Sequence, residues 1–242
     1  MSSDANLVVA LVVATIQMMA ETKQAQATGL SGFAQLAVLV ATSLSIVSLV
    51  MALLLTPLWV HRALDISEVP QRLLLEPDRA HELSDGLIGD LVTPGADFRM
   101  DGGRGGPFLD ARERAHLADV RGVLLACLMA GGLASIGLVV SFARSGQRQP
   151  LWRAVGRGGA LVLLGLVALA VYTAIDFERA FDGFHALFFP GGNYIFDPRS
   201  QSLVVLYPPE FWQLTGIAAG VLAGSLGSLA ALGGRRLGGR WW

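Results

Sequence analysis

His116 and His185 are the two residues of this sequence best suited to acid–base chemistry, and His185 has the more unusual surroundings. It lies in the run Phe-His-Ala-Leu-Phe-Phe at residues 184–189. Burial among aromatic rings disfavours the imidazolium, which lowers the pKa of the histidine and keeps the ring neutral. A neutral imidazole is a competent general base near pH 7. The alternative interpretation is an interfacial histidine that binds a lipid headgroup.

His116 lies in the segment RERAHLADVR, three residues before Asp119. If this segment is helical, the two side chains share one face, so that Asp119 can orient the imidazole and fix which nitrogen carries the proton. Arg121 follows at the edge of an apolar run, where a charge is costly. We therefore expect Asp119 and Arg121 to pair or to line a wet cavity. The alternative is that these charges only anchor the end of a helix.

Motifs for other kinds of catalysis are absent from the sequence. It contains no His-Glu-x-x-His, Gly-x-Ser-x-Gly or Ser-x-x-Lys pattern, which leaves zinc protease and serine hydrolase chemistry without support. The glycine-rich run at 102–107 lacks the Gly-Lys-Ser/Thr of a phosphate-binding loop. Cys127 is the only cysteine, so a disulfide within the chain is excluded. We expect no bound metal, no cofactor and no nucleic-acid partner.

The composition indicates that lipid is the main solvent of these residues. The 242-residue chain is 53% hydrophobic and only 15% charged, whereas soluble domains average about 25% charged residues. A spanning helix needs roughly 20 mostly apolar residues. Four stretches meet this requirement, namely residues 33–60, 120–143, 159–175 and 211–233.

The placement of arginine predicts the orientation of these four helices. The segment 144–158 and the tail 234–242 carry arginines and no acidic residue, so both are expected on the cytoplasmic side. Acidic residues outnumber arginines in the segment 61–119. This segment and residues 176–210 are therefore expected outside, so that His116 and His185 approach each other at the outer boundary of the bilayer.

The N-terminal residues 1–32 contain an apolar stretch that is too short to span a bilayer comfortably. Asp4 occupies a position where a signal peptide would carry a basic residue. We expect an interfacial or partly disordered leader. Two alternatives are a fifth spanning helix and a start codon assigned too early, since Met18 and Met19 precede a plausible shorter leader.

The two outer segments are expected to form a small cap. Residues 78–91 have the pattern of an amphipathic helix, with apolar residues on one face at Ala80, Leu83, Leu87 and Leu91. Residues 202–207 are prone to form a strand. The predicted fold is therefore an all-α membrane protein with four transmembrane helices and a small mixed α/β extracytoplasmic cap.

The remaining histidines, His61 and His81, fall in the first outer segment. His61 directly follows the first spanning stretch, and His81 lies on the expected amphipathic helix. We expect both to be solvated surface residues without a catalytic role.

HLADVR at residues 116–121 and FHALFFPGGNYIFDP…LVVLYPPEFW at 184–212 together resemble the DUF1461 family of integral membrane proteins. That family includes the lipoprotein intramolecular transacylases (Lit), and the likeness extends over about residues 33–233. Tyr194 stands where the family pattern has tryptophan. The family's two functional histidines match His116 and His185, and which of them is the base stays open. Asp119 and Arg121 are expected to support them.

The resemblance implies an acyltransferase of the bacterial cytoplasmic membrane with its active site on the extracytoplasmic face. Such an enzyme moves the sn-2 acyl chain of a diacylglyceryl-modified lipoprotein onto the α-amine of its N-terminal cysteine, giving lyso-form lipoprotein. An α-amino group has a pKa of about 8, so a histidine base suits its deprotonation. Two rival functions remain: a non-enzymatic scaffold in envelope assembly, and a lipid ester hydrolase in which water replaces the amine.

Overall fold

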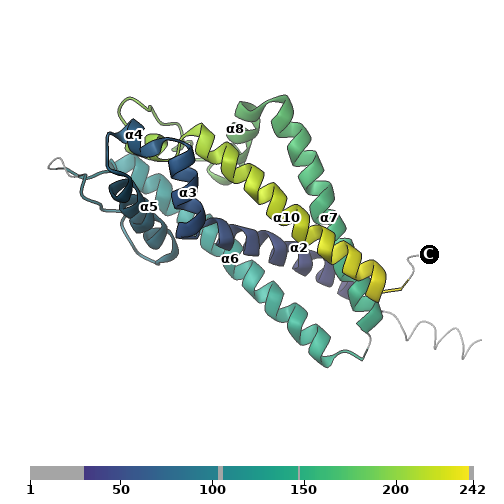
Figure 1. Cartoon of the computed structure of the whole chain (residues 1–242). Coiled ribbons are helices and arrows are strands. Elements are labelled where there is room, and N and C mark those ends of the chain that lie inside the picture. Colours follow the sequence, from purple (N-terminus) through teal and green to yellow (C-terminus); the bar gives the residue numbers. More distant parts are fainter. Residues whose placement is uncertain (1–29, 103–105, 147, 240–242) are drawn as a thin grey trace, which may run out of the picture.

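The computed structural model describes residues 30–102, 106–146 and 148–239, so the expectation for residues 1–32 falls almost entirely outside the described part. Helices form the architecture of the described residues (Figure 1). Their order is α2 (Gly32–Leu54), α3 (Pro57–Ile66), α4 (Val69–Leu73), α5 (Pro77–Val92), α6 (Ala111–Arg144), α7 (Arg148–Ile175), α8 (Phe177–Phe188), α9 (Ser202–Leu206) and α10 (Pro209–Leu237).

Four of these helices, α2, α6, α7 and α10, are long and apolar enough to cross a membrane. Their outward faces carry large apolar side chains that no other part of the described chain covers, such as Leu133, Leu164 and Val221. Exposed apolar surface of this extent is stable only in contact with lipid. The expectation of four spanning helices is confirmed.

The helix boundaries differ from the expected spans because local signals extend or interrupt the helices. α6 begins at Ala111, since Asp110 and Glu113 form a capping box that starts the helix before its apolar part. α7 already begins at Arg148, so most of the segment expected as a loop is helical. α2 ends at Leu54, and a separate helix starts at Pro57, a residue favoured in the first helical turn.

Glycines allow α7 and α10 to pack very closely. A Cβ added to Gly159 would lie 2.5 Å from the carbonyl oxygen of Gly227, and a Cβ on Gly234 would collide with Gly156. Small residues at such positions let helices approach in lipid, where van der Waals packing drives helix association. α2 contacts α6, α7 and α10 and so holds the bundle together.

The cap consists of α3, α4, α5, α9 and the first turns of α6. Its core includes Leu87, Phe98 and Leu206, which are almost completely buried. Ser84 and the hydroxyl of Tyr207 lie 2.9 Å apart within it, and burial raises the pKa of Tyr207 to about 12. The amphipathic helix expected at residues 78–91 is confirmed as α5: Ala80 and Leu83 on its expected apolar face are buried, and Leu87 and Leu91 pack in this core.

The expected mixed α/β character of the cap is wrong. Among the residues that the structure describes there is no strand, only an isolated bridge between Asp101 and Pro107. The segment expected as a strand forms helix α9 instead. Leu203 and Leu206 are both buried, and residues three apart share one face of a helix but opposite faces of a strand. The burial requirement of these leucines thus favours the helix.

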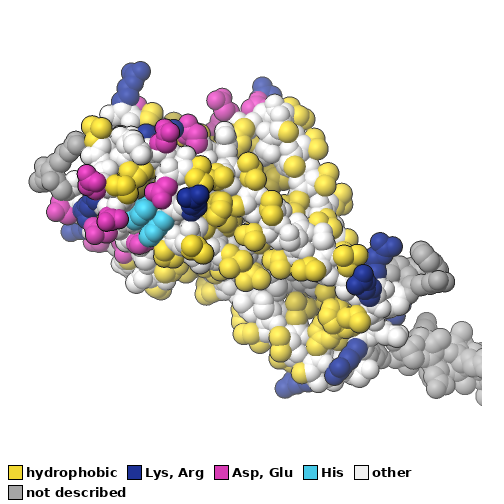
Figure 2. Space-filling model, viewed as in Figure 1, with side chains coloured by type: hydrophobic (Ala, Val, Ile, Leu, Met, Phe, Trp, Pro, Cys, Tyr) yellow, Lys and Arg dark blue, Asp and Glu magenta, His cyan; other side chains and the backbone are white. Residues whose placement is uncertain are grey.

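His61 and His81 lie at the surface of the cap, where they also join α3 to α5. Their rings stack with centroids 4.1 Å apart. His61 Nε2 lies 2.8 Å from the carboxylate of Asp85, and His81 Nε2 lies 2.9 Å from that of Asp65. Each helix therefore contributes one histidine and one aspartate to a crossed brace on the cap surface, where Figure 2 shows histidine beside acidic side chains.

Candidate active site

The position of His116 is set by the start of α6. Asp110 caps this helix, accepting a hydrogen bond from the backbone N–H of Glu113 at 2.8 Å, and that bond lowers the pKa of Asp110. Glu113 is only 1% exposed. It accepts hydrogen bonds from the backbone N–H of Asp110 at 2.6 Å and of Leu203 at 2.7 Å. Glu113 thereby fixes α9 to α6 one turn before His116.

His185 comes from α8, a strongly amphipathic helix that packs on α7 (Figure 1). Asp176 caps the helix by accepting from the backbone N–H of Arg179 at 3.0 Å. In the last turn, Nδ1 of His185 lies 2.8 Å from the carbonyl oxygen of Phe181. The half-buried position of His185 lowers the pKa of its imidazole, although the Phe181 carbonyl and Asp182 act in the opposite direction.

The two imidazoles meet, as expected, although 69 residues separate them in the sequence. Their ring centroids are 6.2 Å apart. Aromatic rings surround them: Phe189 and Phe196 present edges to His116, and Tyr194 lies beside His185. His116 is buried. The pair therefore occupies a partly dehydrated site in which hydrogen bonds and charges are stronger than in water.

Asn193 connects His116 to Asp119, a contact that the sequence did not reveal. The amide Nδ2 of Asn193 donates to Asp119 Oδ2 at 2.7 Å. Its Oδ1 lies 3.4 Å from Nδ1 of His116. Asp119 thus reaches the imidazole through Asn193 rather than directly. The one sequence signal for Asn193 was its place in the turn Pro-Gly-Gly-Asn, which gives no indication of a partner on α6.

Arg121 does not pair with Asp119. Its guanidinium donates to the carbonyl oxygen of Ala96 at 2.5 Å and lies over the ring of Phe98, 5.1 Å from the centroid. Arg121 therefore anchors the segment that follows α5 and supports the cap. Of the expected supporting residues, the structure places Asp119 beside the histidines and Arg121 in the cap.

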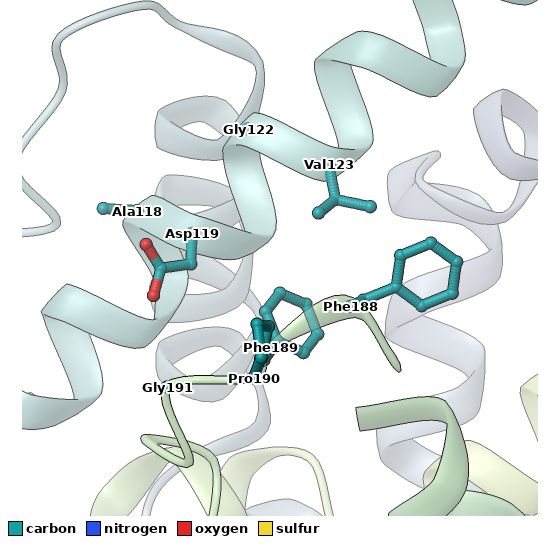
Figure 3. Close-up of a pocket in the computed structure, with 8 residues that line it drawn as sticks. All are labelled: Ala118, Asp119, Gly122, Val123, Phe188, Phe189, Pro190 and Gly191. Carbon is teal, nitrogen blue, oxygen red and sulfur yellow. The ribbon is translucent and has the colours of Figure 1, made fainter. Parts of the chain in front are cut away.

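A groove of about 490 Å³ (Figure 3) is lined in part by Phe189, whose ring contacts both His116 and His185. One wall is α6 and the other is the end of α8 with the turn that follows it. The lining residues are Ala118, Asp119, Gly122, Val123, Phe188, Phe189, Pro190 and Gly191. The groove thus combines a carboxylate with apolar side chains, and this suits a ligand that has a polar head and a hydrocarbon chain.

The described residues contain no group of three or more His, Cys, Asp or Glu side chains placed to hold a metal ion. The two imidazoles, with ring centroids 6.2 Å apart, can transfer protons to and from a bound substrate.

The structure resembles solved structures of one membrane-integral enzyme. The lipoprotein intramolecular transacylase Lit from Bacillus cereus matches with a TM-score of 0.68 and 24% identity, over 84% of this chain and 93% of that chain. A variant of that enzyme with a histidine replaced by arginine matches with a TM-score of 0.63 and 20% identity, over 93% and 96%. A third structure, with the histidine replaced by alanine, matches with a TM-score of 0.62 and 20% identity, over 91% and 96%. These matches show a common fold.

The sequence itself identifies the family. No curated protein matches the chain significantly. The model of the family described as lipoprotein intramolecular transacylase Lit matches residues 33–212, most of the chain and both histidines. The expected resemblance is therefore confirmed: the chain belongs to the lipoprotein intramolecular transacylase family of membrane-integral acyltransferases.

Proposed function

We propose that the protein transfers the sn-2 acyl chain of a diacylglyceryl-modified lipoprotein to the α-amine of the same N-terminal cysteine, giving lyso-form lipoprotein. The reaction takes place at the extracytoplasmic face of a bacterial cytoplasmic membrane. The observation that carries this proposal is the pair of imidazoles 6.2 Å apart beside a groove with a polar and an apolar part.

The proposed step is an ester aminolysis in which every proton is accounted for. The amine nitrogen attacks the ester carbonyl and forms a C–N bond, and a histidine Nε2 takes the proton that the amine loses. The C–O bond to the glycerol then breaks. The resulting alkoxide receives the proton from the imidazolium, which restores the neutral ring. No net proton is consumed, and the greater stability of an amide over an ester drives the reaction.

The surroundings of the histidines suit this reaction. Phe189 and Phe196 contact the His116 ring, which limits the access of water to the ester and so favours the amine as nucleophile. Amine and ester belong to one substrate molecule, so the groove has only to fold them together. Orientation of this kind can supply several kcal/mol, up to about 7–11 kcal/mol for well-aligned groups.

The test is mass spectrometry of lipoprotein N-termini in a strain that lacks its own N-acylating enzymes. Expression of the wild-type protein should produce the lyso form. His116→Ala and His185→Ala should each lower its formation, by about 10²–10⁴-fold for the histidine that transfers the proton. His61→Gln replaces one histidine of the crossed brace on the cap surface. It is the matched control and should stay active.

Three outcomes contradict the proposal in different ways. If wild-type protein leaves diacylglyceryl peptide with a free amine, transacylation is wrong. If it releases free fatty acid without N-acylation, the protein is a hydrolase. If both histidine variants remain as active as wild type, the protein transfers acyl chains by a different mechanism.

A further inference from the structure

The connected side chains of Asp119, Asn193 and His116 determine which nitrogen of His116 carries the proton. An ionised carboxylate accepts hydrogen bonds only, so the amide group that faces Asp119 must be the NH₂ of Asn193. The oxygen Oδ1 of Asn193 therefore faces His116 Nδ1. Because this oxygen is also an acceptor only, Nδ1 carries the hydrogen. The lone pair of the neutral ring is then on Nε2.

The contact between Asn193 and His116, at 3.4 Å, is long for a hydrogen bond. Catalytic hydrogen bonds are often long without substrate and shorten in the reacting complex. The link from Asn193 to Asp119 is short at 2.7 Å, as expected for an acceptor with a negative charge. Asp119 thus holds Asn193 in place, and we expect the His116 imidazole to move closer to Asn193 in the reacting complex.

His185 differs from His116 in what lies behind its Nδ1. That atom faces the carbonyl oxygen of Phe181, which is neutral. Asp182, on the same helix, interacts electrostatically with His185. In the described part of the chain, however, no carboxylate is hydrogen-bonded to His185 directly or through another side chain. Asp119, in contrast, faces His116 through Asn193 and attracts the positive charge that the ring acquires on taking a proton.

We propose, on the basis of the transacylase function above, that His116 is the general base, that Asn193 is a positioning residue that holds it in the Nδ1–H tautomer, and that Asp119 acts on it through Asn193. His185 stays neutral and accepts a second N–H of the substrate amine at its own Nε2, which orients the nucleophile. The two roles follow from the presence of a carboxylate behind one imidazole and a carbonyl behind the other.

The experiment measures kcat and KM against pH for the purified full-length protein in lipid nanodiscs, with a synthetic diacylglyceryl lipopeptide as substrate. Asn193→Ala should lower kcat by about 10–100-fold and leave KM within about twofold, because Asn193 orients the base and does not bind the substrate. Asn193→Asp supplies another acceptor for Nδ1–H. This variant should recover part of the lost rate, and the acid limb of its profile should move to higher pH.

Asp119→Asn keeps an oxygen that can accept from Asn193 but removes the charge. Without the negative charge the His116 imidazolium is less stable, so the acid limb of kcat should move to lower pH while the maximum rate falls. Glu178→Gln removes an exposed charge from α8 and is the matched control, whose acid limb should stay in place. Thermal unfolding of each variant identifies loss of folding.

The outcomes separate this proposal from the function on which it rests. If folded Asn193→Ala retains the wild-type kcat, the role of Asn193 is wrong. If Asp119→Asn lowers the rate equally at every pH, Asp119 has only a structural role. If wild-type protein makes no lyso-form lipopeptide, the proposed function itself fails.

Discussion

At the scale of single residues, the burial of His185 couples protonation to stability. Burial lowers the pKa of this histidine below its usual 6.5, so at pH values between the folded and unfolded pKa the unfolded chain binds more protons. The stability contributed by the neutral ring is therefore present above about pH 6.5 and is lost as pH falls through the folded pKa. Acidification should lower the unfolding temperature in detergent, and His185→Phe should reduce this drop. An equal drop in wild type and variant would show that His185 is not the responsible group.

The role of Asn193 could not be predicted from the sequence. His116 and His185 could be identified because their types and their neighbours suggest chemistry. Asn193 has no such signal, because its two partners lie on α6, 77 and 74 residues earlier. Arg121 shows the reverse case. Its place at the edge of an apolar run suggested that it pairs with Asp119 or lines a wet cavity, but the chain folds back after α5 and offers backbone carbonyl oxygens instead.

At the scale of elements, Glu113 joins the start of α6 to α9. Both of its carboxylate oxygens accept backbone hydrogen bonds in a buried position. Glu113→Gln leaves one acceptor oxygen and turns an NH₂ group toward a backbone donor, so one buried group loses its partner. This should cost about 1–3 kcal/mol, measured as a lower thermal unfolding temperature. Glu82→Gln removes only an exposed ion pair with Arg79 and should cost less than about 1 kcal/mol. An equal loss in both variants would contradict the role assigned to Glu113.

The elements differ in how far the sequence predicts them. The four long helices follow from composition, because a chain in hydrocarbon has to satisfy its backbone hydrogen bonds within each helix. α5 follows from the periodicity of its apolar residues over several turns. α9 has only five residues, too few for a periodicity, and its helical form depends on the distant Glu113. The sequence therefore predicts where the cap lies, but it does not predict that the segment of α9 is helical.

At the scale of the whole molecule, charge is distributed along the bundle axis. Acidic side chains gather on the cap, whereas the opposite end carries arginine side chains (Figure 2). From residue 120 to residue 175 the chain contains no acidic residue. Because positive charges stay on the cytoplasmic side during insertion, we predict that the α6–α7 connection is cytoplasmic. The cap and both histidines are then extracytoplasmic.

Cysteine labelling in intact cells measures this orientation. In a Cys127→Ala background, a cysteine that replaces Arg148 at the start of α7 should resist a membrane-impermeant maleimide until the cells are opened. A cysteine that replaces Arg99, whose side chain is 74% exposed on the cap, should react at once from outside. The two sites lie at opposite ends of the bundle, so each serves as the control for the other. Labelling of position 148 from outside, with position 99 protected, would show that the protein has the opposite orientation in the membrane. The histidine pair would then lie on the cytoplasmic face, where the proposed reaction with an exported lipoprotein could not occur.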